Sequence, residues 1–249
     1  RRKPDNSGYL LLVQNIMYHI RHGVDQVVVY ADTTHHGDHT ISLLRPFMDR
    51  GLLLVVLVDV ESAQGRNGND CLLRMQGRTK LMRSMDSDEF MYVPAWNLTG
   101  DWAASRASLY DVAERLLRDY DTLYLHGYLW EKPANMSSEL ALRTDARKRK
   151  PQYFQGMSEK HLDRADAIAL DFIHFPGGCF RPEGCKLRFQ NEIVYAHLKG
   201  RERFTPWNES FDVRDDFFAG EAALLQSQLC RWMGAAGLGC TPGSWEPQR

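Results

Sequence analysis

Two aspartates and a glutamate, Asp86, Asp88 and Glu89, lie within four residues of one another in this chain, flanked by the apolar residues Met85 and Phe90. In an extended or turning backbone, residues i and i+2 point the same way, so Asp86 and Asp88 present two carboxylates to one cation. Such hard oxygen ligands suit Mn²⁺ or Mg²⁺, ions that keep open positions for phosphate oxygens. The pattern predicts a divalent-metal site for a sugar-nucleotide pyrophosphate, with a solvated acidic surface as the alternative.

The segments around these acids alternate between helical and strand patterns. Apolar spacing predicts a helix over 9–21 that stops at Gly23, and a second helix from 38 or 40 to 50 that stops at Gly51. Buried strands are expected at 26–31, 52–58, 90–93 and 122–125, and a further helix at 108–117. Residues 64–70 are rich in glycine and asparagine and predict a loop, and residues 216–233 predict a closing helix.

This order of strand, helix and strand is typical of an α/β fold with a mostly parallel central sheet and helices on both faces. Ligands of such sheets bind at the carboxyl ends of the strands, which makes Asp32, at the end of the first strand, a candidate site residue. The absence of internal repeats or low-complexity linkers favours a single domain over 1–249, with 234–249 as a flexible tail rich in glycine and proline.

Composition excludes several classes of protein. The chain has 249 residues, 43% of them hydrophobic, and its 31 Lys+Arg against 32 Asp+Glu give a formal net charge of -1. A chain of this length buries a sizeable core, which excludes disorder. The charge balance argues against a nucleic-acid partner, and no apolar run is long enough to span a bilayer.

Together these segments resemble glycosyltransferase family 92 and its relatives with the GT-A (Rossmann-like) fold. The resemblance rests on a helix ending in Tyr18 and His19, a Gly23-Val24-Asp25 turn, a strand leading to Tyr30 and Asp32, and the acidic block from Asp86 to Phe90. It continues at Lys160, at Ile173 and His174, and at Ala196 to Lys199, and it spans about residues 10 to 205. The acidic block is its most specific part.

The resemblance implies a role for each matching residue. Asp32, Asp86 and Lys160 would bind the nucleotide sugar, and Asp86 and Asp88 would bind the metal with His197, for which His174 is the rival. The region from Leu125 to Glu131 is similar to the segment beside the acceptor. It makes Glu131 a candidate for the base of an inverting reaction, and Asp171 is a second candidate. The implied reaction moves a hexose, with galactose favoured, from a nucleotide sugar such as a UDP-sugar to a glycan hydroxyl.

Two departures from this pattern keep alternatives open. The first strand of the family has no counterpart here, because the chain begins at the helix that follows it; a silent sugar-binding or scaffold protein on the same fold is therefore a second hypothesis. The cluster from His35 to His39 contains three histidines and an aspartate, which favours a metal-dependent hydrolase as a third. A polar loop beside the donor pocket also accounts for this cluster.

The cysteines and asparagines indicate in which cellular compartment the protein is located. Cys179 and Cys185 are close enough to close a small disulfide loop, and the five cysteines contain no pairing typical of a zinc site. Asn-x-Ser/Thr triplets at Asn97, Asn135 and Asn208 exceed what chance would give. These features predict a lumenal domain of the Golgi or another secretory compartment, anchored by an N-terminal helix that this chain does not contain.

Overall fold

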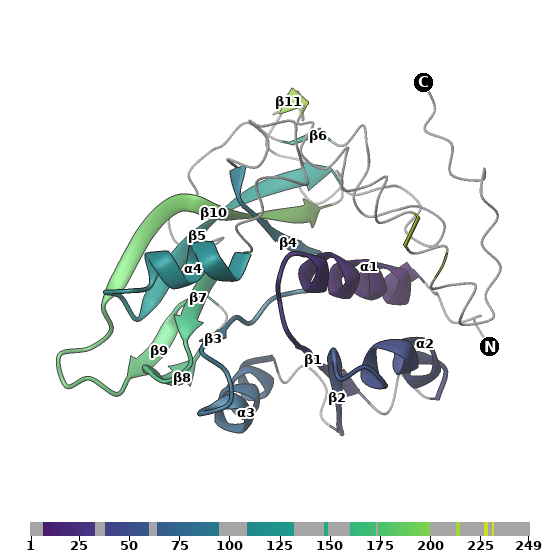
Figure 1. Ribbon diagram of the computed structural model, residues 1–249, viewed down its shortest axis with the longest axis horizontal. Helices are drawn as coiled ribbons and strands as arrows, with labels where there is room; N and C mark the ends of the chain where they lie inside the picture. The colour runs from purple at the N-terminus through teal and green to yellow at the C-terminus, as the bar shows by residue number, and fades with distance from the viewer. Residues whose placement is uncertain are drawn as a thin grey trace.

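The computed structural model describes residues 7–32, 38–59, 64–94, 109–131, 147–148, 160–172, 174–199, 213–214, 227–228 and 231. Helices and strands alternate through the first half, so the α/β prediction is confirmed (Figure 1). The helices are α1 (Ser7–Arg21), α2 (Asp38–Met48), α3 (Gln64–Met75) and α4 (Leu109–Leu116). The strands are β1 (Val27–Asp32), β2 (Leu53–Val58), β3 (Leu81–Met82), β4 (Glu89–Tyr92), β5 (Thr122–Glu131), β6 (Arg147–Lys148), β7 (Lys160–Arg164), β8 (Ile168–Asp171), β9 (Pro176–Cys179), β10 (Leu187–Lys199) and β11 (Val213–Arg214).

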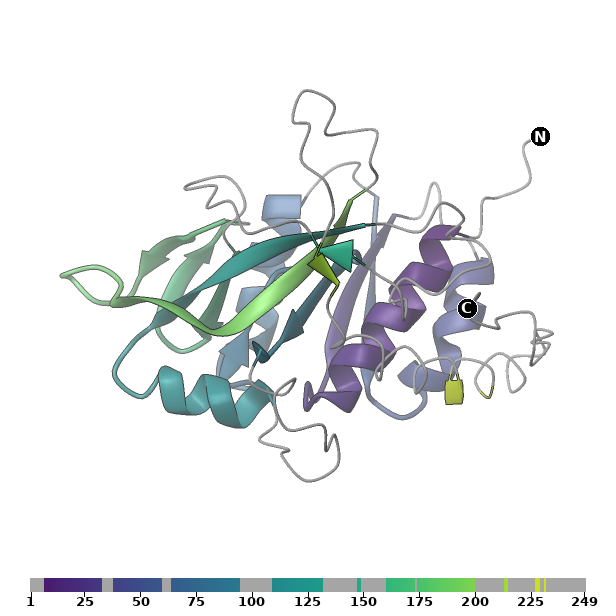
Figure 2. The ribbon, with the colours of Figure 1, turned by 90° about the horizontal axis from the view of Figure 1, so that it is seen from above.

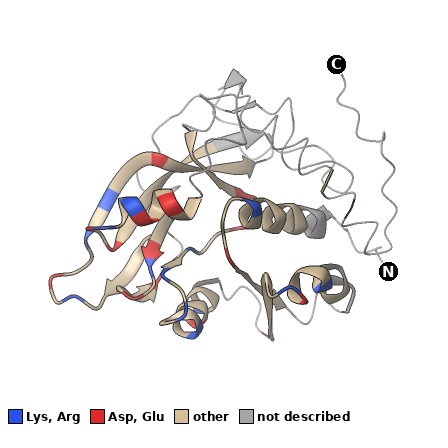
Figure 3. Cartoon of the chain, in the orientation of Figure 1, with Lys and Arg blue, Asp and Glu red and all other residues tan. Residues whose placement is uncertain are grey.

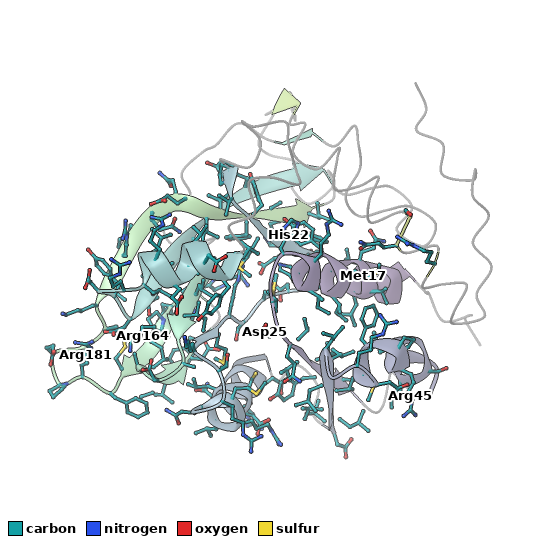
Figure 4. All side chains as sticks on the ribbon, viewed as in Figure 1. Met17, His22, Asp25, Arg45, Arg164 and Arg181 are labelled. Carbon is teal, nitrogen blue, oxygen red and sulfur yellow. A yellow bond between two sulfur atoms is a disulfide. The ribbon has the colours of Figure 1, made fainter. Side chains whose placement is uncertain are left out.

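Strands β1 and β2 form a parallel pair from Val27 opposite Leu53 to Asp32 opposite Val58. Apolar side chains of α1 and α2 pack against this pair, and Figure 4 marks the two helices at Met17 and Arg45. The buried members of this cluster are Val13, Ile16, Leu44, Phe47 and Leu53. The strand and helix pattern of the first 58 residues is therefore confirmed.

Glycines end α1 and α2 as predicted. Gly23 has a φ of 92° and Gly51 a φ of 70°, in the left-handed region that side chains disfavour. The amide of Val24 donates to the His19 carbonyl at 3.0 Å, and the amide of Leu52 donates to the Phe47 carbonyl at 3.0 Å. Both helices thus end in a Schellman motif, which turns the chain directly into the following strand.

The larger sheet is mixed, and the expectation of a mostly parallel sheet is wrong for it. Its strand order is β11-β6-β5-β10-β4, with β7 paired to β5 and β3 paired to β7. Strands β5 and β10 are parallel, but β4 is antiparallel to β10 and β7 is antiparallel to β5. Strands β8 and β9, which follow one another at a short interval, form a separate antiparallel pair, as expected for strands without a long crossover connection. Within the described residues, β1 and β2 do not pair with this sheet.

Helix α4 covers the large sheet with the apolar stripe predicted from sequence. Leu109, Val112, Ala113 and Leu116 are buried. They belong to the same cluster as Leu123, Leu125, Ile193 and Tyr195 of the sheet. Seen from above, β5 and β10 cross the molecule side by side as one curved layer (Figure 2).

Residues 64–70 form the first half of α3 and are not a loop, which corrects the prediction. Leu72 of this helix is buried in a cluster with Met82, Ala165 and Ile168. The charged residues Asp70 and Arg74 pair at 2.5 Å on its exposed side. Figure 3 shows acidic and basic residues along the cartoon, including both kinds on α4. Burial of Leu72 outweighs the weak helix propensity of glycine and asparagine, which a local reading of the sequence does not include.

A disulfide joins Cys179 to Cys185, the pairing considered from sequence, while Cys71 is a free thiol. The loop that it closes carries Arg181, which reaches Asp121 at 3.1 Å (Figure 4). Among the described residues, no helix has the length and apolar character needed to cross a membrane. The asparagine triplets, the cluster from 35 to 37, most of the predicted closing helix and the predicted tail lie outside the described residues.

Candidate active site

The acidic block folds as a tight turn, here called the acidic turn (residues 86–89). The amide of Glu89 donates to the Asp86 carbonyl at 3.1 Å, and the amide of Asp86 donates to Glu89 Oε2 at 3.1 Å. The Asp88 carbonyl accepts from the amide of Leu198 in β10 at 2.9 Å. The turn is therefore fixed to β10 at the point where β4 begins.

Glu89 lies at the centre of a buried ion group. Its side chain is 0% exposed, with Arg83 Nη2 3.4 Å from Oε2 and Lys160 Nζ 3.1 Å from Oε1. Lys160 also reaches Asp86 Oδ2 at 3.4 Å. Burial lowers the pKa of Arg83, and the charge of Glu89 opposes this shift. The Arg83 guanidinium also lies 5.0 Å from the centre of the Tyr195 ring, a cation–π contact.

His197 brings an imidazole to the acidic turn from β10, where it pairs with Glu89 across the antiparallel ladder. Its Nε2 lies 3.5 Å from Asp88 Oδ1, and its Nδ1 lies 3.9 Å from Glu89 Oε1. The sequence prediction placed His197 with the aspartates, and the structure brings these residues together. The β10–β4 pairing is the physical reason.

The donor atoms suit a divalent cation. One ligand atom each from Asp86, Glu89 and His197 lies within 4.8 Å of the others. Glu89 Oε1 and His197 Nε2 are buried without a hydrogen-bond partner among the described residues. The carboxylate oxygen has lone pairs, and His197 offers one at Nε2 when its neutral ring carries the proton on Nδ1. Carboxylate oxygens with one imidazole are a ligand set that suits Mn²⁺. The residues present therefore fit the ion implied by the sequence.

Helix α1 holds the far edge of β4 with side chains in place of a neighbouring strand. Asn15 Nδ2 donates to the Glu89 carbonyl at 2.6 Å, and Tyr18 Oη donates to the Met91 carbonyl at 2.7 Å. The amide of Met91 donates to His19 Nε2 at 3.3 Å. Because these groups satisfy buried backbone atoms of β4, the tyrosine-histidine pair in the sequence supports the acidic turn from behind.

The structure places the other predicted site residues on several different elements. Lys160 is at the site, on β7, and Glu131 ends β5 opposite Lys199, two positions beyond the pairing of Leu129 with His197. Asp171 is 1% exposed and accepts from Ser84 Oγ at 2.5 Å. His174 is exposed in the turn between β8 and β9 and is not part of the group of Asp86, Glu89 and His197. The side chains of Asp32 and Glu131 lie outside the described residues.

Sequence reasoning assigned no role to Glu89 and did not consider Arg83. Glu89 stood within the acidic block, and its place as the first residue of a buried strand was the available signal. Arg83 lies three residues before Asp86 in a segment without a recognisable pattern. Its role depends on Tyr195, which is distant in sequence, so local reasoning had no means of finding it.

An α/β chain that gathers carboxylates, an amine and an imidazole at one end of a sheet has the make-up of an enzyme that acts on a charged substrate. The profile of glycosyltransferase family 92 matches residues 5–212, and the chain belongs to this family. No curated protein matches it at a significant level. The crystal structure of HddC from Yersinia pseudotuberculosis aligns with 78% of this chain and 82% of that chain, at 9% identity and a TM-score of 0.39.

Proposed function

We propose that this glycosyltransferase is metal-dependent and moves a hexose, with galactose favoured, from a UDP-sugar to a glycan hydroxyl. The observation that carries the metal dependence is the convergence of Asp86, Glu89 and His197 with two uncommitted donor atoms. The UDP-sugar and the galactose preference rest on the resemblance to the family in the segments around the acidic turn.

Asp86, Asp88, Glu89 and His197 would hold Mn²⁺ or Mg²⁺, since Asp88 Oδ1 lies 3.5 Å from His197 Nε2. When bound, such an ion offsets the charge that builds on the departing nucleoside diphosphate. The charges of the site support a cation: Arg83 and Lys160 bring two positive charges, whereas Asp86, Asp88 and Glu89 bring three negative ones. This excess of negative charge attracts a cation before any phosphate arrives.

The chain's own residues orient the substrates around this site. Lys160 is held between Asp86 and Glu89, where its ammonium would supply a positive charge for a diphosphate. Asp32 ends β1 and is assigned to the nucleotide. In an inverting reaction, Glu131 accepts the proton of the attacking hydroxyl. We favour Glu131 over Asp171 because the Asp171 carboxylate is buried and engaged with Ser84.

We assign the protein to the lumen of the Golgi or another secretory compartment. The Cys179–Cys185 disulfide supports an oxidising compartment. The asparagine triplets and the glycan acceptor agree with the same location.

The variant Asp88→Ala tests the proposal. Calorimetry should show UDP binding to the wild type only with Mn²⁺ present, and Asp88→Ala should lose this binding while keeping its circular dichroism spectrum. The control is Asp166→Ala, which removes an exposed carboxylate paired with Arg164 at 2.8 Å and should bind like the wild type. Full Mn²⁺-dependent binding and transfer by Asp88→Ala would show the assignment to be wrong.

A further inference from the structure

A second cluster of ionisable side chains lies against β7. Successive side chains of a strand point to opposite faces, so Lys160 points to the acidic turn while His161 and Asp163 point away from it. Asp171 of β8 completes the cluster, and one ligand atom from each of the three residues lies within 4.8 Å of the others. All three side chains are 1% exposed.

The contacts of the His161 ring define its protonation. Nδ1 lies 2.6 Å from Asp163 Oδ2, and Nε2 lies 2.5 Å from the Phe172 carbonyl oxygen. A carbonyl and an ionised carboxylate only accept hydrogen bonds, so both ring nitrogens must donate. Thr122 Oγ1 donates to the other oxygen of Asp163 at 2.8 Å, which favours the ionised carboxylate. His161 is therefore an imidazolium that joins β7 to the end of β8.

Asp171 carries this connection to the acidic turn. Its Oδ2 accepts from Ser84 Oγ at 2.5 Å, and Ser84 stands two residues before Asp86. The backbone of Asp171 is held by Asn69, whose Oδ1 accepts from its amide at 3.0 Å and whose Nδ2 donates to its carbonyl at 2.8 Å. A continuous path thus runs from β7 through β8 to the segment that leads into the turn.

Helix α3 closes over this path at Gly68. A Cβ built at Gly68 would lie 2.7 Å from Asp171 Oδ2 and 3.2 Å from Ser84 Oγ. At the nearby Gly65 of the same helix, a Cβ would meet nothing within 4 Å. A side chain at Gly68 would crowd both groups, because the helix backbone lies directly against the Asp171 carboxylate and the Ser84 hydroxyl.

We propose that His161, Asp163 and Asp171 are positioning residues that hold Ser84, and with it the acidic turn, against Lys160. The hydrogen-bond network is inferred from these contacts alone, whereas its effect on metal binding depends on the proposed function. A metal ion in this cluster would need a ring nitrogen with a free lone pair, and both nitrogens of His161 are already hydrogen-bonded.

The surrounding charges agree with a protonated ring. The charged groups that act on His161 are Asp163 of β7 and Asp171 of β8. Asp171 in turn interacts with Lys160, which lies on the other face of β7, and with the Cys71 thiol of α3. Burial alone would lower the pKa of His161, but the bonds to Asp163 and Phe172 outweigh it and raise the pKa. Burial also raises the pKa of Asp171, while Ser84 opposes that shift.

Nuclear magnetic resonance tests the network without any substrate. In protein labelled with ¹⁵N-histidine, both ring nitrogens of His161 should remain protonated at pH 7.5, about one unit above the ordinary histidine pKa. Ser84→Ala should increase the hydrogen-exchange rate of the Glu89 amide about tenfold, because the turn loses its connection to Asp171, and Ser84→Thr should restore it. A His161 ring that is neutral at this pH, or a Glu89 amide that Ser84→Ala does not change, overturns the proposal.

The consequence for the site is tested by Mn²⁺ affinity in the presence of UDP. Gly68→Ala should weaken it about tenfold, the lower end of the effect of groups that orient metal ligands, while Gly65→Ala binds like the wild type. Equal affinity of Gly68→Ala and the wild type overturns the positioning role. If the wild type binds no Mn²⁺, the proposed function is overturned instead. The nuclear magnetic resonance measurements on His161 then still test whether the hydrogen-bond network exists. Selective broadening of the His161 signals by Mn²⁺ would indicate a metal site here and overturn the inference.

Discussion

Lys160 Nζ lies 3.1 Å from Glu89 Oε1, and the two side chains are 2% and 0% exposed. This distance makes an ion pair, yet Glu89 Oε1 has no aligned hydrogen bond within the described part of the chain. The oxygen is therefore neutralised by charge but keeps a lone pair. A buried carboxylate oxygen that keeps a lone pair is able to bind a cation that arrives with a substrate.

Replacing Lys160 with methionine removes the charge and keeps most of the side-chain volume. The variant Lys160→Met should lower the free energy of unfolding by about 3 kcal/mol, because breaking a buried ion pair leaves a charge without its partner. Denaturant unfolding measures this change. Lys80→Met removes an exposed ion pair to Glu114 at 3.2 Å, and its stability should stay close to that of the wild type. Equal stabilities for both variants would contradict the buried pair.

Sequence patterns predicted the parts of the fold that depend on local chemistry. Gly23 and Gly51 mark helix ends because left-handed backbone favours glycine wherever it occurs. The acidic turn was found because Asp86, Asp88 and Glu89 are close together in sequence, between segments with strand and helix patterns. The resemblance to the family placed His197 with the aspartates, and the β10–β4 pairing brings it to the turn. No role was predicted for Glu89, whose buried position at the start of β4 places it at the centre of the ion group.

Interactions between distant segments account for what the sequence did not predict. The helix at 64–75 forms because Leu72 packs under residues almost a hundred positions away, such as Ile168. Asp171 was considered as a base because it lies two strand positions before Ile173. Its contact with Ser84, 87 residues earlier, depends on how α3 and β8 pack, which no local spacing encodes.

Gly127 of β5 leaves space for the ring of Tyr195, its partner across the parallel pair. A Cβ at this position would lie 2.5 Å from the ring, and the ring in turn contacts Arg83. Gly127→Ala should therefore lower the free energy of unfolding by about 1–3 kcal/mol through overpacking. Thermal unfolding measures it against Gly178→Ala, where a Cβ meets nothing within 4 Å. A stability of Gly127→Ala at or above that of Gly178→Ala would refute the close approach.

The Cys179–Cys185 disulfide closes a loop with a sequence separation of 6. Loop-closure entropy for so short a loop gives about 2 kcal/mol, and the double change Cys179→Ser and Cys185→Ser should lower stability by this amount. Reductant should destabilise the wild type to the same degree and leave the double variant unchanged. If reductant affects both proteins equally, the stabilisation comes from another source.

His19 should make the protein sensitive to acid. Its Nδ1 lies 2.8 Å from the Asn15 carbonyl oxygen and its Nε2 accepts from Met91, so the ring is neutral. Burial lowers its pKa from 6.5 to about 3. The unfolded chain therefore binds a proton below pH 6.5 that the folded protein does not bind until about pH 3. The free energy of unfolding should fall through this window, by about 5 kcal/mol in total at 1.36 kcal/mol per pKa unit.

The variant His19→Gln removes this titration and keeps a side-chain oxygen that can accept from Met91. Urea unfolding at several pH values between 6.5 and 4 should show a shallower loss of stability for His19→Gln than for the wild type. His174→Gln changes an exposed histidine and should follow the wild-type curve. His161 acts in the opposite direction, because a raised pKa adds stability below pH 6.5 that is lost as the pH rises through the folded value. A wild-type slope in His19→Gln would mean that the buried ring is not the source of the acid sensitivity.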